Sequence, residues 1–574
     1  MNQFEYNLSI DELKKRTSDD YLLTKKFLTP DSKEYKELKD GDKKALIYLV
    51  KAANIIDYIQ MRLDNHHNIE VKKFLDEEEN SKSEVSRLTK QLFDYQKGVN
   101  ALDCMSNEVK LIKGIDTKLG RGFYPEDLSV DEFHNILIKM INDGKITEVK
   151  NILTQRSVVV RNDEELKGID YIDYFDEEFK HMADLLESAA RCSSNEDFNE
   201  YLLLQAKALR TADPMLDAYA DKKWATLQDT PLEFTITRED YEDEMTSTII
   251  ENKTLLNLLE NNNIKFFTKD SLGCRVGIVN KEGTENLLKI KKYLPLLAKN
   301  MPQSDRYNQL ITNTDDKQTM VDVDMVVTTG DAGAYRGGIT LAENLPNDDK
   351  MTFTIGGGRR NVYHRQVRFV SDFEKLQHKL DQILVKEQHS YYDEEADHLT
   401  VIGHENAHTL GPKGNQEKLG KYSDIIEENK ADMAALAFLD ILEEQGLYTK
   451  LERDKIVVTK VTKNFLKSKP VLSQAHRVRT VMQNKYFYDN GAYIIQDGKI
   501  KVNIEAVPQI AYKMLEEIIS VQLSNNFDVA EKYVEKYFIW TEEMNIIADK
   551  LQKIDKTLNG RVENKLADYL LTLE

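Results

Sequence analysis

The spacing of hydrophobic residues predicts a chain built mostly of helices. Up to about residue 230, apolar positions recur every three to four residues, which is typical of amphipathic helices. We expect helices at 44–63, 130–141, 174–186 and 196–211, and a nearly continuous helical region from Ser371 onward. The small number of residues that interrupt helices, 10 Pro and 25 Gly, agrees with this prediction.

Three short segments follow the two-residue alternation of β-strands instead. They are 232–237, 320–327 and 351–355. A glycine-rich stretch runs from Gly330 to Gly338, and Gly356-Gly357-Gly358-Arg359-Arg360 follows soon after. The second stretch lacks the strand–loop–helix context and the Lys-Ser/Thr ending of a phosphate-binding loop, so we expect a flexible turn there. No repeat or proline-rich linker is visible, and the pattern predicts a predominantly helical α+β protein.

Composition places the chain among soluble globular proteins. Its 574 residues are 41% hydrophobic and 31% charged, with a net charge of −20, and they are enough for two or more domains. The acidic balance argues against a general nucleic-acid binder. Cys104, Cys192 and Cys274 are widely spaced and odd in number, which predicts free thiols in a reducing compartment. The first residues show no signal peptide, and no apolar stretch approaches the length of a membrane span, so we expect a cytoplasmic protein without membrane contact.

The segment His404-Glu405-Asn406-Ala407-His408 carries the clearest chemistry. On a helix, residues i and i+4 lie one above the other, so the two imidazoles can hold one metal ion with a Glu between them. Glu428 lies 20 residues beyond His408 and supplies a third ligand, with Asp432 one turn further. Three protein ligands leave a place for water, whereas structural zinc sites have four. An exposed helix with two chance histidines is the alternative, but apolar residues flank the motif and Gly411-Pro412 ends it. The spacing predicts a zinc hydrolase of the peptidase kind.

Four further stretches matter when they are taken in order with this motif. They are Glu-Asp-Tyr-Glu-Asp-Glu at 239–244, Asp-Ser-Leu-Gly-Cys-Arg at 270–275 leading into 278–281, Asn-Leu-Pro-Asn-Asp-Asp at 344–349, and Gln-Ala-His-Arg at 474–477. Taken one at a time and in this order, the four stretches are typical of a charged helix start, a turn, a second turn and a histidine on a helix. Together, from about Leu232 to Arg479, they resemble the dipeptidyl peptidase III family of zinc metallopeptidases.

The resemblance implies a role for each matching residue. The expected ligands of one zinc ion per chain are His404, His408 and Glu428. The expected general base is Glu405, and the groups expected to steady the transition state are Tyr241 and His476. The residues expected to hold the free amino terminus of the substrate are Glu239, Asn344 and Asn347. The carboxylates expected to orient the ligand histidines are Glu427 and Asp432.

The resemblance also implies a two-lobed fold with a cleft between the lobes. One lobe is helical and carries zinc, and the other holds a small β-barrel surrounded by helices. We expect residues 1–276 plus 304–370 in the lower lobe and 277–303 plus 371–574 in the upper, catalytic lobe. The chain departs from the family in its five-residue zinc motif, where most members have His-Glu-x-x-Gly-His, and in a shorter gap to the Glu ligand, as in thermolysin-type peptidases. We find no Nudix box, which some relatives carry in a fused domain.

The predicted function is an exopeptidase that releases dipeptides from the amino ends of short peptides. A thermolysin-like endopeptidase or an aminopeptidase with the same zinc ligands is an alternative. Blocking the amino terminus of the substrate distinguishes these alternatives from the predicted function, because only the exopeptidase should then fail to cleave. A third possibility, from another class, is a binding protein that keeps zinc, sequesters peptides and turns them over poorly. The intact Glu405 argues against it, because proteins that have lost activity commonly lose the base.

Overall fold

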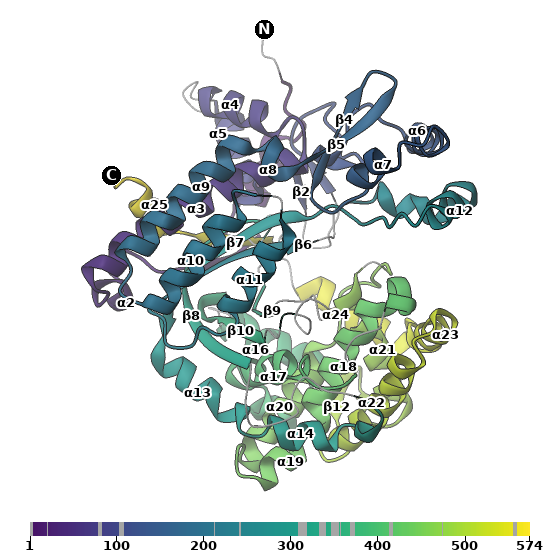
Figure 1. Cartoon of the computed structure of the whole chain (residues 1–574). Helices are drawn as coiled ribbons and strands as arrows, with labels where there is room; N and C mark the ends of the chain where they lie inside the picture. The colour runs from purple at the N-terminus through teal and green to yellow at the C-terminus, as the bar shows by residue number, and fades with distance from the viewer. Residues whose placement is uncertain are drawn as a thin grey trace.

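The structure is a computed structural model of the chain, and it describes most of the sequence. The described residues are 4–19, 21–78, 83–102, 108–211, 213–239, 243–307, 318–331, 340–345, 355, 358–367, 373–412, 417–472, 474–554 and 559–573. Within them the protein is a predominantly helical α+β structure with one central sheet (Figure 1).

The central sheet has five strands in the order β6-β7-β8-β10-β9. The strands are β6 (Leu232–Glu239), β7 (Ser271–Asn280), β8 (Gln318–Gly330), β9 (Ala342–Leu345) and β10 (Arg359–His364). β7 is antiparallel to β6 and β8, β10 runs parallel to β8, and β9 is antiparallel to β10. In this register Glu239 lies opposite Ser271, and Asn344 lies opposite Asn361.

The sheet is strongly curled but open. Arg275 on β7 forms an ion pair with Glu343 on β9, although β8 and β10 lie between these strands. Strands are spaced by about 4.8 Å, so a flat sheet would hold β7 and β9 about 14 Å apart, with their side chains perpendicular to the sheet. A barrel needs its two edge strands to pair, and within the described strands β6 and β9 do not. The expected closed β-barrel is therefore not formed by these strands.

The two faces of the sheet belong to different hydrophobic cores. Successive side chains of a strand point to opposite faces. Val362 and Val321 lie in a first core, whereas their neighbours Tyr363 and Met320 lie in a second core. The sheet thus connects the two cores and brings residues of the second core onto the same strands as residues of the first.

Helices from the first half of the chain build the first core and a smaller cluster beside it. They are α1 (Ile10–Thr17), α2 (Lys33–Lys36), α3 (Asp40–Asp64), α4 (Asn68–Glu78), α5 (Glu84–Gln96), α6 (Val130–Asn142), α7 (Ile146–Ile152), α8 (Tyr171–Tyr174), α9 (Asp176–Cys192), α10 (Glu196–Ala208), α11 (Pro214–Trp224) and α12 (Lys253–Asn261). Two hairpins accompany them, β2 (Asn100–Leu102) with β3 (Glu108–Lys110), and β4 (Ser157–Asn162) with β5 (Glu165–Asp170). The four helices expected in this half are present as α3, α6, α9 and α10, although α9 begins at Asp176 rather than 174 and α10 ends at Ala208 rather than 211.

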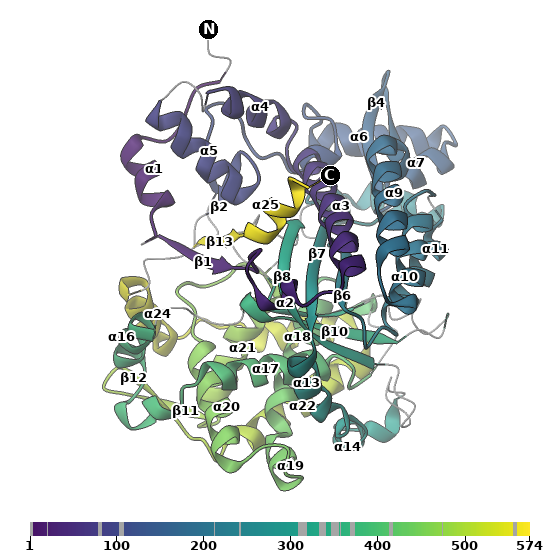
Figure 2. The ribbon, with the colours of Figure 1, turned by 90° about the vertical axis from the view of Figure 1, so that its left-hand side faces the viewer.

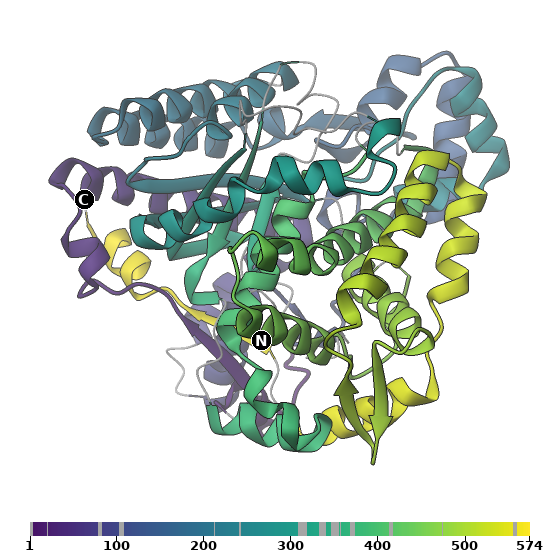
Figure 3. The ribbon, with the colours of Figure 1, turned by 90° about the horizontal axis from the view of Figure 1, so that it is seen from below.

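The second core is made of helices from α13 onward. They are α13 (Lys281–Lys291), α14 (Leu294–Asn300), α16 (Phe373–Ile383), α17 (Glu394–Ala407), α18 (Ser423–Ala437), α19 (Leu439–Glu444), α20 (Lys450–Lys463), α21 (Ala475–Asp489), α22 (Val507–Ser524), α23 (Phe527–Tyr537) and α24 (Glu542–Ile554). The hairpin β11 (Tyr493–Gln496) with β12 (Lys499–Val502) lies among them. Seen from below, these green and yellow helices lie together (Figure 3). Among them α18 packs on α17, α21 and α22.

The last described residues return to the first core. β13 (Asn559–Glu563) pairs in parallel with β1 (Leu22–Lys26), and α25 (Lys565–Leu571) packs on α3 (Figure 2). Leu566 and Leu570 lie in the first hydrophobic core. The expected upper lobe extended to residue 574, but this C-terminal segment packs with the first core instead. The reason is that the apolar face of α25 packs against the N-terminal helix α3.

Other expectations from the sequence have mixed outcomes. Cys192 and Cys274 are free thiols, as expected, and Cys104 lies outside the described residues. The strands expected at 232–237 and 320–327 are confirmed by β6 and β8, whereas 351–354 lie outside the described part. The expected turn at 356–360 is wrong for Arg359 and Arg360, which begin β10. Among the helices that the structure describes, none combines the length and the apolar composition needed to cross a bilayer.

Candidate metal centre and its surroundings

Helix α17 presents the two histidines on one face. Asp393 caps its start, with Oδ1 accepting hydrogen bonds from the backbone N–H of Glu395 and Ala396. His404 lies within the helix, and His408 is its C-cap residue. One helical turn separates them, so the rings meet, and their Nε2 atoms are 3.1 Å apart. The helical spacing predicted from the sequence therefore produces the expected pair of imidazoles.

Helix α18 brings the third group. Oε2 of Glu428 is 3.4 Å from His404 Nε2, and Oε1 is 3.7 Å from His408 Nε2. Gly403 allows the two helices to approach closely, because a Cβ at this position would lie only 3.1 Å from the Cβ of Ala435 on α18. One ligand atom from each of His404, His408 and Glu428 lies within 4.8 Å of the others.

The spacing of these atoms fits a tetrahedral metal site. Zinc binds nitrogen and oxygen at about 2.0–2.1 Å, which places neighbouring tetrahedral ligands about 3.4 Å apart. The measured separations of 3.1, 3.4 and 3.7 Å lie around that value. Two imidazoles and one carboxylate are also a donor set that zinc takes when a fourth position is left for water. The group is therefore compatible with a zinc site.

Two carboxylates fix the orientation of the imidazoles. His404 Nδ1 lies 2.9 Å from Asp432 Oδ1, and His408 Nδ1 lies 3.0 Å from Glu427 Oε1. An ionised carboxylate only accepts hydrogen bonds, so each Nδ1 carries the proton. In the neutral imidazole the lone pair is then on Nε2, the atom that faces Glu428. Asp432 and Glu427 therefore each contact the Nδ1 of one histidine, and their role in orienting metal ligands stays a prediction.

Each orienting carboxylate has cationic or amide partners of its own. Asp432 Oδ2 is 2.8 Å from both Lys460 Nζ and Arg479 Nη1, and 3.0 Å from Gln483 Nε2. Glu427 Oε1 is 2.7 Å from Lys430 Nζ. Arg479 also reaches Glu428, at 3.3 Å.

The sequence prediction missed these supporting residues. A signal for two of them was present, because Arg479 and Gln483 lie three and seven residues beyond His476 and so share its face of α21. Lys460 belongs to α20, far away in the sequence, and only the packing of helices brings it to Asp432.

Burial shapes the acid–base behaviour of the group. Burial raises the pKa of Glu405 to about 7, which places this carboxyl near the pH at which a base works best. Burial lowers the pKa of His408 to about 4, so its imidazole is neutral at pH 7. Burial also disfavours the charged form of His404, but the Asp432 and Glu428 carboxylates outweigh it and raise this pKa to about 9. Against the effect of burial, His476 and His404 hold the pKa of Glu428 well below its ordinary value.

Two other residues are expected to act in catalysis, and one lies beside this group whereas the other lies outside the described part. His476 Nδ1 is 2.9 Å from Glu428 Oε2, and its side chain is 64% exposed, so the ring also reaches solvent. Tyr241 lies outside the described residues. The stretch 474–477 is the start of α21, as its alternative reading suggested.

The residues expected to hold the substrate's amino terminus are only partly described. Glu239 is the last residue of β6, and its side chain is outside the described part, as is Asn347. Asn344 lies on β9 and is buried. Its Nδ2 donates to Asn361 Oδ1, and its Oδ1 accepts from Arg359 Nη1 at 2.7 Å. An amide has two donor hydrogens and two acceptor lone pairs, so these two bonds use half of its capacity.

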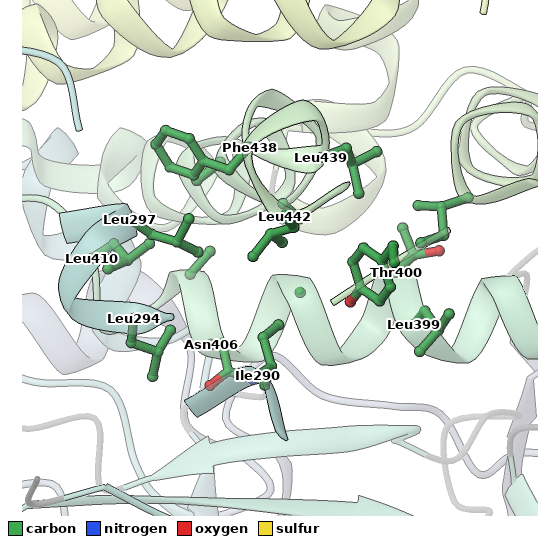
Figure 4. Close-up of a pocket in the computed structure, with 16 residues that line it drawn as sticks. Ile290, Leu294, Leu297, Leu399, Thr400, Asn406, Leu410, Phe438, Leu439 and Leu442 are labelled. Carbon is green, nitrogen blue, oxygen red and sulfur yellow. The ribbon is translucent and has the colours of Figure 1, made fainter. Parts of the chain in front are cut away.

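An apolar cavity lies on the other side of α17. It is lined by Leu399, Leu410 and Asn406, by Phe438 of the α18–α19 turn, and by Ile290 and Leu294 from α13 and α14 (Figure 4). Its volume is about 20 Å³, which is room for about one water molecule. A peptide does not fit there, so this cavity is a small packing gap behind the helix.

The fold and the site together define an α+β protein with a candidate zinc centre on two packed helices. Two solved structures share this fold. The dipeptidyl-peptidase III structure from Caldithrix abyssi has a TM-score of 0.77 and 23% sequence identity, covering 97% of this chain and 100% of that one. The dipeptidyl-peptidase III structure from Corallococcus sp. strain EGB has a TM-score of 0.78 and 20% identity, covering 98% and 99%. The chain therefore has the fold of the dipeptidyl-peptidase III structures, as its motifs suggested.

A sequence relative extends over nearly the same length. Nudix hydrolase 3 of Arabidopsis thaliana is 23% identical over an alignment 594 positions long, which covers 93% of this chain and 72% of that protein. No protein-family model matches the chain.

Proposed function

We propose that the chain is a zinc-dependent peptidase that releases dipeptides from the amino ends of short peptides. The observation that carries the proposal is the group of His404, His408 and Glu428, whose Nε2 and carboxylate oxygens lie at tetrahedral spacing. Both histidines are held through Nδ1 by carboxylates, as in many zinc proteins. The shared fold with dipeptidyl-peptidase III structures supports the reaction class.

In this proposal Glu405 is the general base. A zinc ion held by the three ligands would polarise the scissile carbonyl and make a hydroxide available near pH 7. The buried carboxylate of Glu405 accepts the proton of the attacking water and passes it to the leaving amine.

Two further groups are proposed to meet the charge that develops on the carbonyl oxygen. His476 contacts Glu428 through Nδ1 and is otherwise exposed, so its ring is accessible to a peptide in front of the ligands. Tyr241, just beyond the end of β6, is proposed as a second donor. Loss of such a donor lowers kcat rather than raising KM, because the interaction is made in the transition state.

The amino end of the peptide is proposed to bind Glu239, Asn344 and Asn347. Glu239 supplies the charge opposite to an ammonium group, and amide oxygens accept its remaining protons. β6 and β9 are opposite edges of the sheet, but the curl that joins Arg275 to Glu343 brings these edges toward each other. A charged binding site for the amino terminus would place the scissile bond two residues from the free amino group of the peptide.

The two hydrophobic cores are proposed to be the cores of two lobes. The lower lobe comprises 1–276 and 304–370 together with the C-terminal segment 559–573, and the upper lobe comprises 277–303 and 371–554. Small-angle X-ray scattering of the Glu405→Gln variant with and without a peptide tests this division. A substrate-dependent decrease in the radius of gyration is expected if the lobes close, and an unchanged radius argues against moving lobes.

Mass spectrometry of products from short peptides tests the function itself. We expect tetrapeptides and longer peptides to lose an N-terminal dipeptide, a chelator to abolish cleavage, and N-acetylated peptides to be poor substrates. Cleavage at internal sites, or equal cleavage of acetylated peptides, would favour an endopeptidase. Release of single residues would favour an aminopeptidase. Zinc bound without any cleavage would favour a peptide-binding protein.

Variants of the centre test the roles with matched controls. His404→Ala and Glu428→Ala should lose the one zinc per chain, whereas His378→Ala, an exposed histidine on α16, should keep it. Glu405→Gln should retain zinc and lose about 10²–10⁴-fold in rate, since an amide accepts no proton. Glu395→Gln, on the exposed first turn of the same helix, should remain active. Full zinc content in either ligand variant would overturn the ligand assignment.

A further inference from the structure

A continuous chain of buried hydrogen bonds runs along β9 and β10. Arg359 Nη1 donates to Asn344 Oδ1 at 2.7 Å, and Asn344 Nδ2 donates to Asn361 Oδ1. Asn361 Nδ2 then donates to the hydroxyl of Tyr363 at 3.2 Å. These four residues are all buried, Asn361 and Tyr363 completely. The donors follow one direction, from the guanidinium toward the Tyr363 hydroxyl.

The chain continues from the sheet into the helix that bears the histidines. The Tyr363 hydroxyl donates to the backbone carbonyl of Ile402 at 3.4 Å, and it accepts from Asn406 Nδ2 at 3.3 Å. Asn406 Nδ2 also donates to the Ile402 carbonyl, at 2.8 Å. Ile402 and Asn406 flank His404 and Glu405 in the sequence, so the hydroxyl is hydrogen-bonded to both ends of the helical turn that carries these two residues.

The bonds around Tyr363 use the whole capacity of its hydroxyl. A phenol has one donor hydrogen and two acceptor lone pairs, and here it donates once and accepts twice. Removing the oxygen leaves amide hydrogens of Asn361 and Asn406 without this acceptor in a buried environment, which is costly. The aromatic ring keeps its packing in the second core when only the oxygen is removed.

We propose that Tyr363 is a positioning residue that holds the proposed peptide-binding strand β9 at a fixed distance from the catalytic turn of α17. The inference rests on the proposed function. An enzyme that counts two residues from an amino terminus needs a fixed spacing between the site that binds this terminus and the base. In an extended peptide each residue advances by about 3.3 Å, so displacements well below this value already spoil the alignment of the scissile bond.

The expected effect of losing the link is on the rate. A displacement of about 1 Å can cost about 10²-fold in rate, so we expect Tyr363→Phe to lower kcat by about 10- to 100-fold. The zinc content should stay at the wild-type level, because Tyr363 contacts neither the ligand atoms nor their carboxylates in the described network. Discrimination against N-acetylated peptides should weaken, because Asn344 loses the constraint that reaches it through Asn361.

Tyr493→Phe is the matched control. Tyr493 is also fully buried in the second core, and its hydroxyl donates to the Asn484 carbonyl at 3.1 Å, away from β9 and α17. Both variants remove one buried hydroxyl from the same core. A general loss of stability should affect both alike, whereas a loss of alignment should appear only in Tyr363→Phe.

The experiment compares kcat, KM, zinc content and hydrogen–deuterium exchange of α17 in the wild type and both variants. A lower kcat and faster exchange of the α17 amides in Tyr363→Phe alone, with zinc retained, support the proposal. Equal kcat and equal exchange in the two variants overturn it, as does loss of zinc from Tyr363→Phe. A wild type that cleaves no peptide refutes the proposed function instead.

Asn406→Ala is the second variant, for use if Tyr363→Phe does not fold. It removes one of the two contacts between the hydroxyl and α17 and leaves the bond to Ile402. We expect the same pattern with a smaller decrease in kcat. Unchanged kcat and unchanged α17 exchange in this variant also overturn the proposal.

Discussion

Replacing Asp432 by Asn should weaken zinc binding through the orientation of His404. The amide has the shape of the carboxylate, but one of its two ends donates. If its oxygen stays beside His404, its NH₂ group faces the donors Lys460, Arg479 and Gln483. If the amide turns over, the NH₂ group faces His404 Nδ1 and forces the proton onto Nε2, the atom needed for the metal. Neither orientation satisfies both sides.

The structure gives the expected size of each effect. Changes in the residues that orient metal ligands typically cost 10- to 100-fold in metal affinity, which is about 1.4–2.7 kcal/mol. Removing one partner of a buried ion pair costs about 3–5 kcal/mol of stability. Lys460 and Arg479 are each 14% exposed, and Arg479 keeps its contact with Glu428, so we expect the lower end, about 3 kcal/mol, in the metal-free protein.

Two measurements separate these effects. Competition with a chromophoric chelator gives the zinc Kd, and urea unfolding of the metal-free protein gives the free energy of unfolding. Adding Lys460→Met to Asp432→Asn removes one uncompensated cation, so it should recover stability without recovering zinc affinity. Asp549→Asn, at an exposed position of α24, is the control and should change neither quantity. A zinc Kd for Asp432→Asn equal to that of the wild type would refute the orienting role, and full recovery of affinity by Lys460→Met would make charge the cause.

Three other predictions concern the same framework and Asp221 on α11. Glu427→Gln should weaken zinc binding about 10-fold by the same assay, because His408 Nδ1 loses its carboxylate; unchanged affinity would contradict this. Gly403→Val should lower the free energy of unfolding by about 1–3 kcal/mol, because its side chain meets Ala435, and an unchanged urea midpoint would show that α17 and α18 can separate freely. Burial raises the pKa of Asp221 from 3.8 to about 6, so its contribution to stability is present below pH 4 and lost as the pH rises through 6. Asp221→Asn should therefore add at most about 3 kcal/mol to the free energy of unfolding at pH 8 and little near pH 4; an equal gain at both would contradict the assignment.

The sequence predicted helices whose burial is one-sided. α6 and α9 are examples, because a helix with one covered face shows the corresponding periodicity. β8 was also predicted although it is buried on both faces, because Asp322 and Asp324 alternate with its apolar residues. The candidate metal centre was predictable for a related reason. The spacing of His404 and His408 is local to one helix, so their meeting needs no knowledge of the tertiary fold. Glu428 was inferred from its place at the start of an apolar run, where a carboxylate needs a partner.

Two strands of the central sheet, β7 and β10, escaped prediction because they are buried on both faces. Residues 270–275, taken alone, are typical of a turn, but β7 begins at Ser271 and is buried along most of its length, so it shows no alternation. β10 is hidden by its composition, since Arg359, Arg360 and Asn361 look like surface residues. In the structure Arg360 is fully buried and pairs with Glu233 on β6 at 2.7 Å. Such partners lie on distant strands, and a single sequence does not show them.

The helix that carries the proposed base is held by three sets of contacts that act in different directions. Gly403 sets its distance from α18, Asp432 sets the rotation of the His404 ring, and Tyr363 ties the backbone turn around His404 to the sheet. The first two act between helices of the second core and determine how the ligand atoms converge. The third acts between this core and the strand that carries Asn344, so it bears on substrate alignment rather than on the metal. Defects in Asp432 and Tyr363 should therefore appear in different quantities, zinc affinity for the first and kcat for the second.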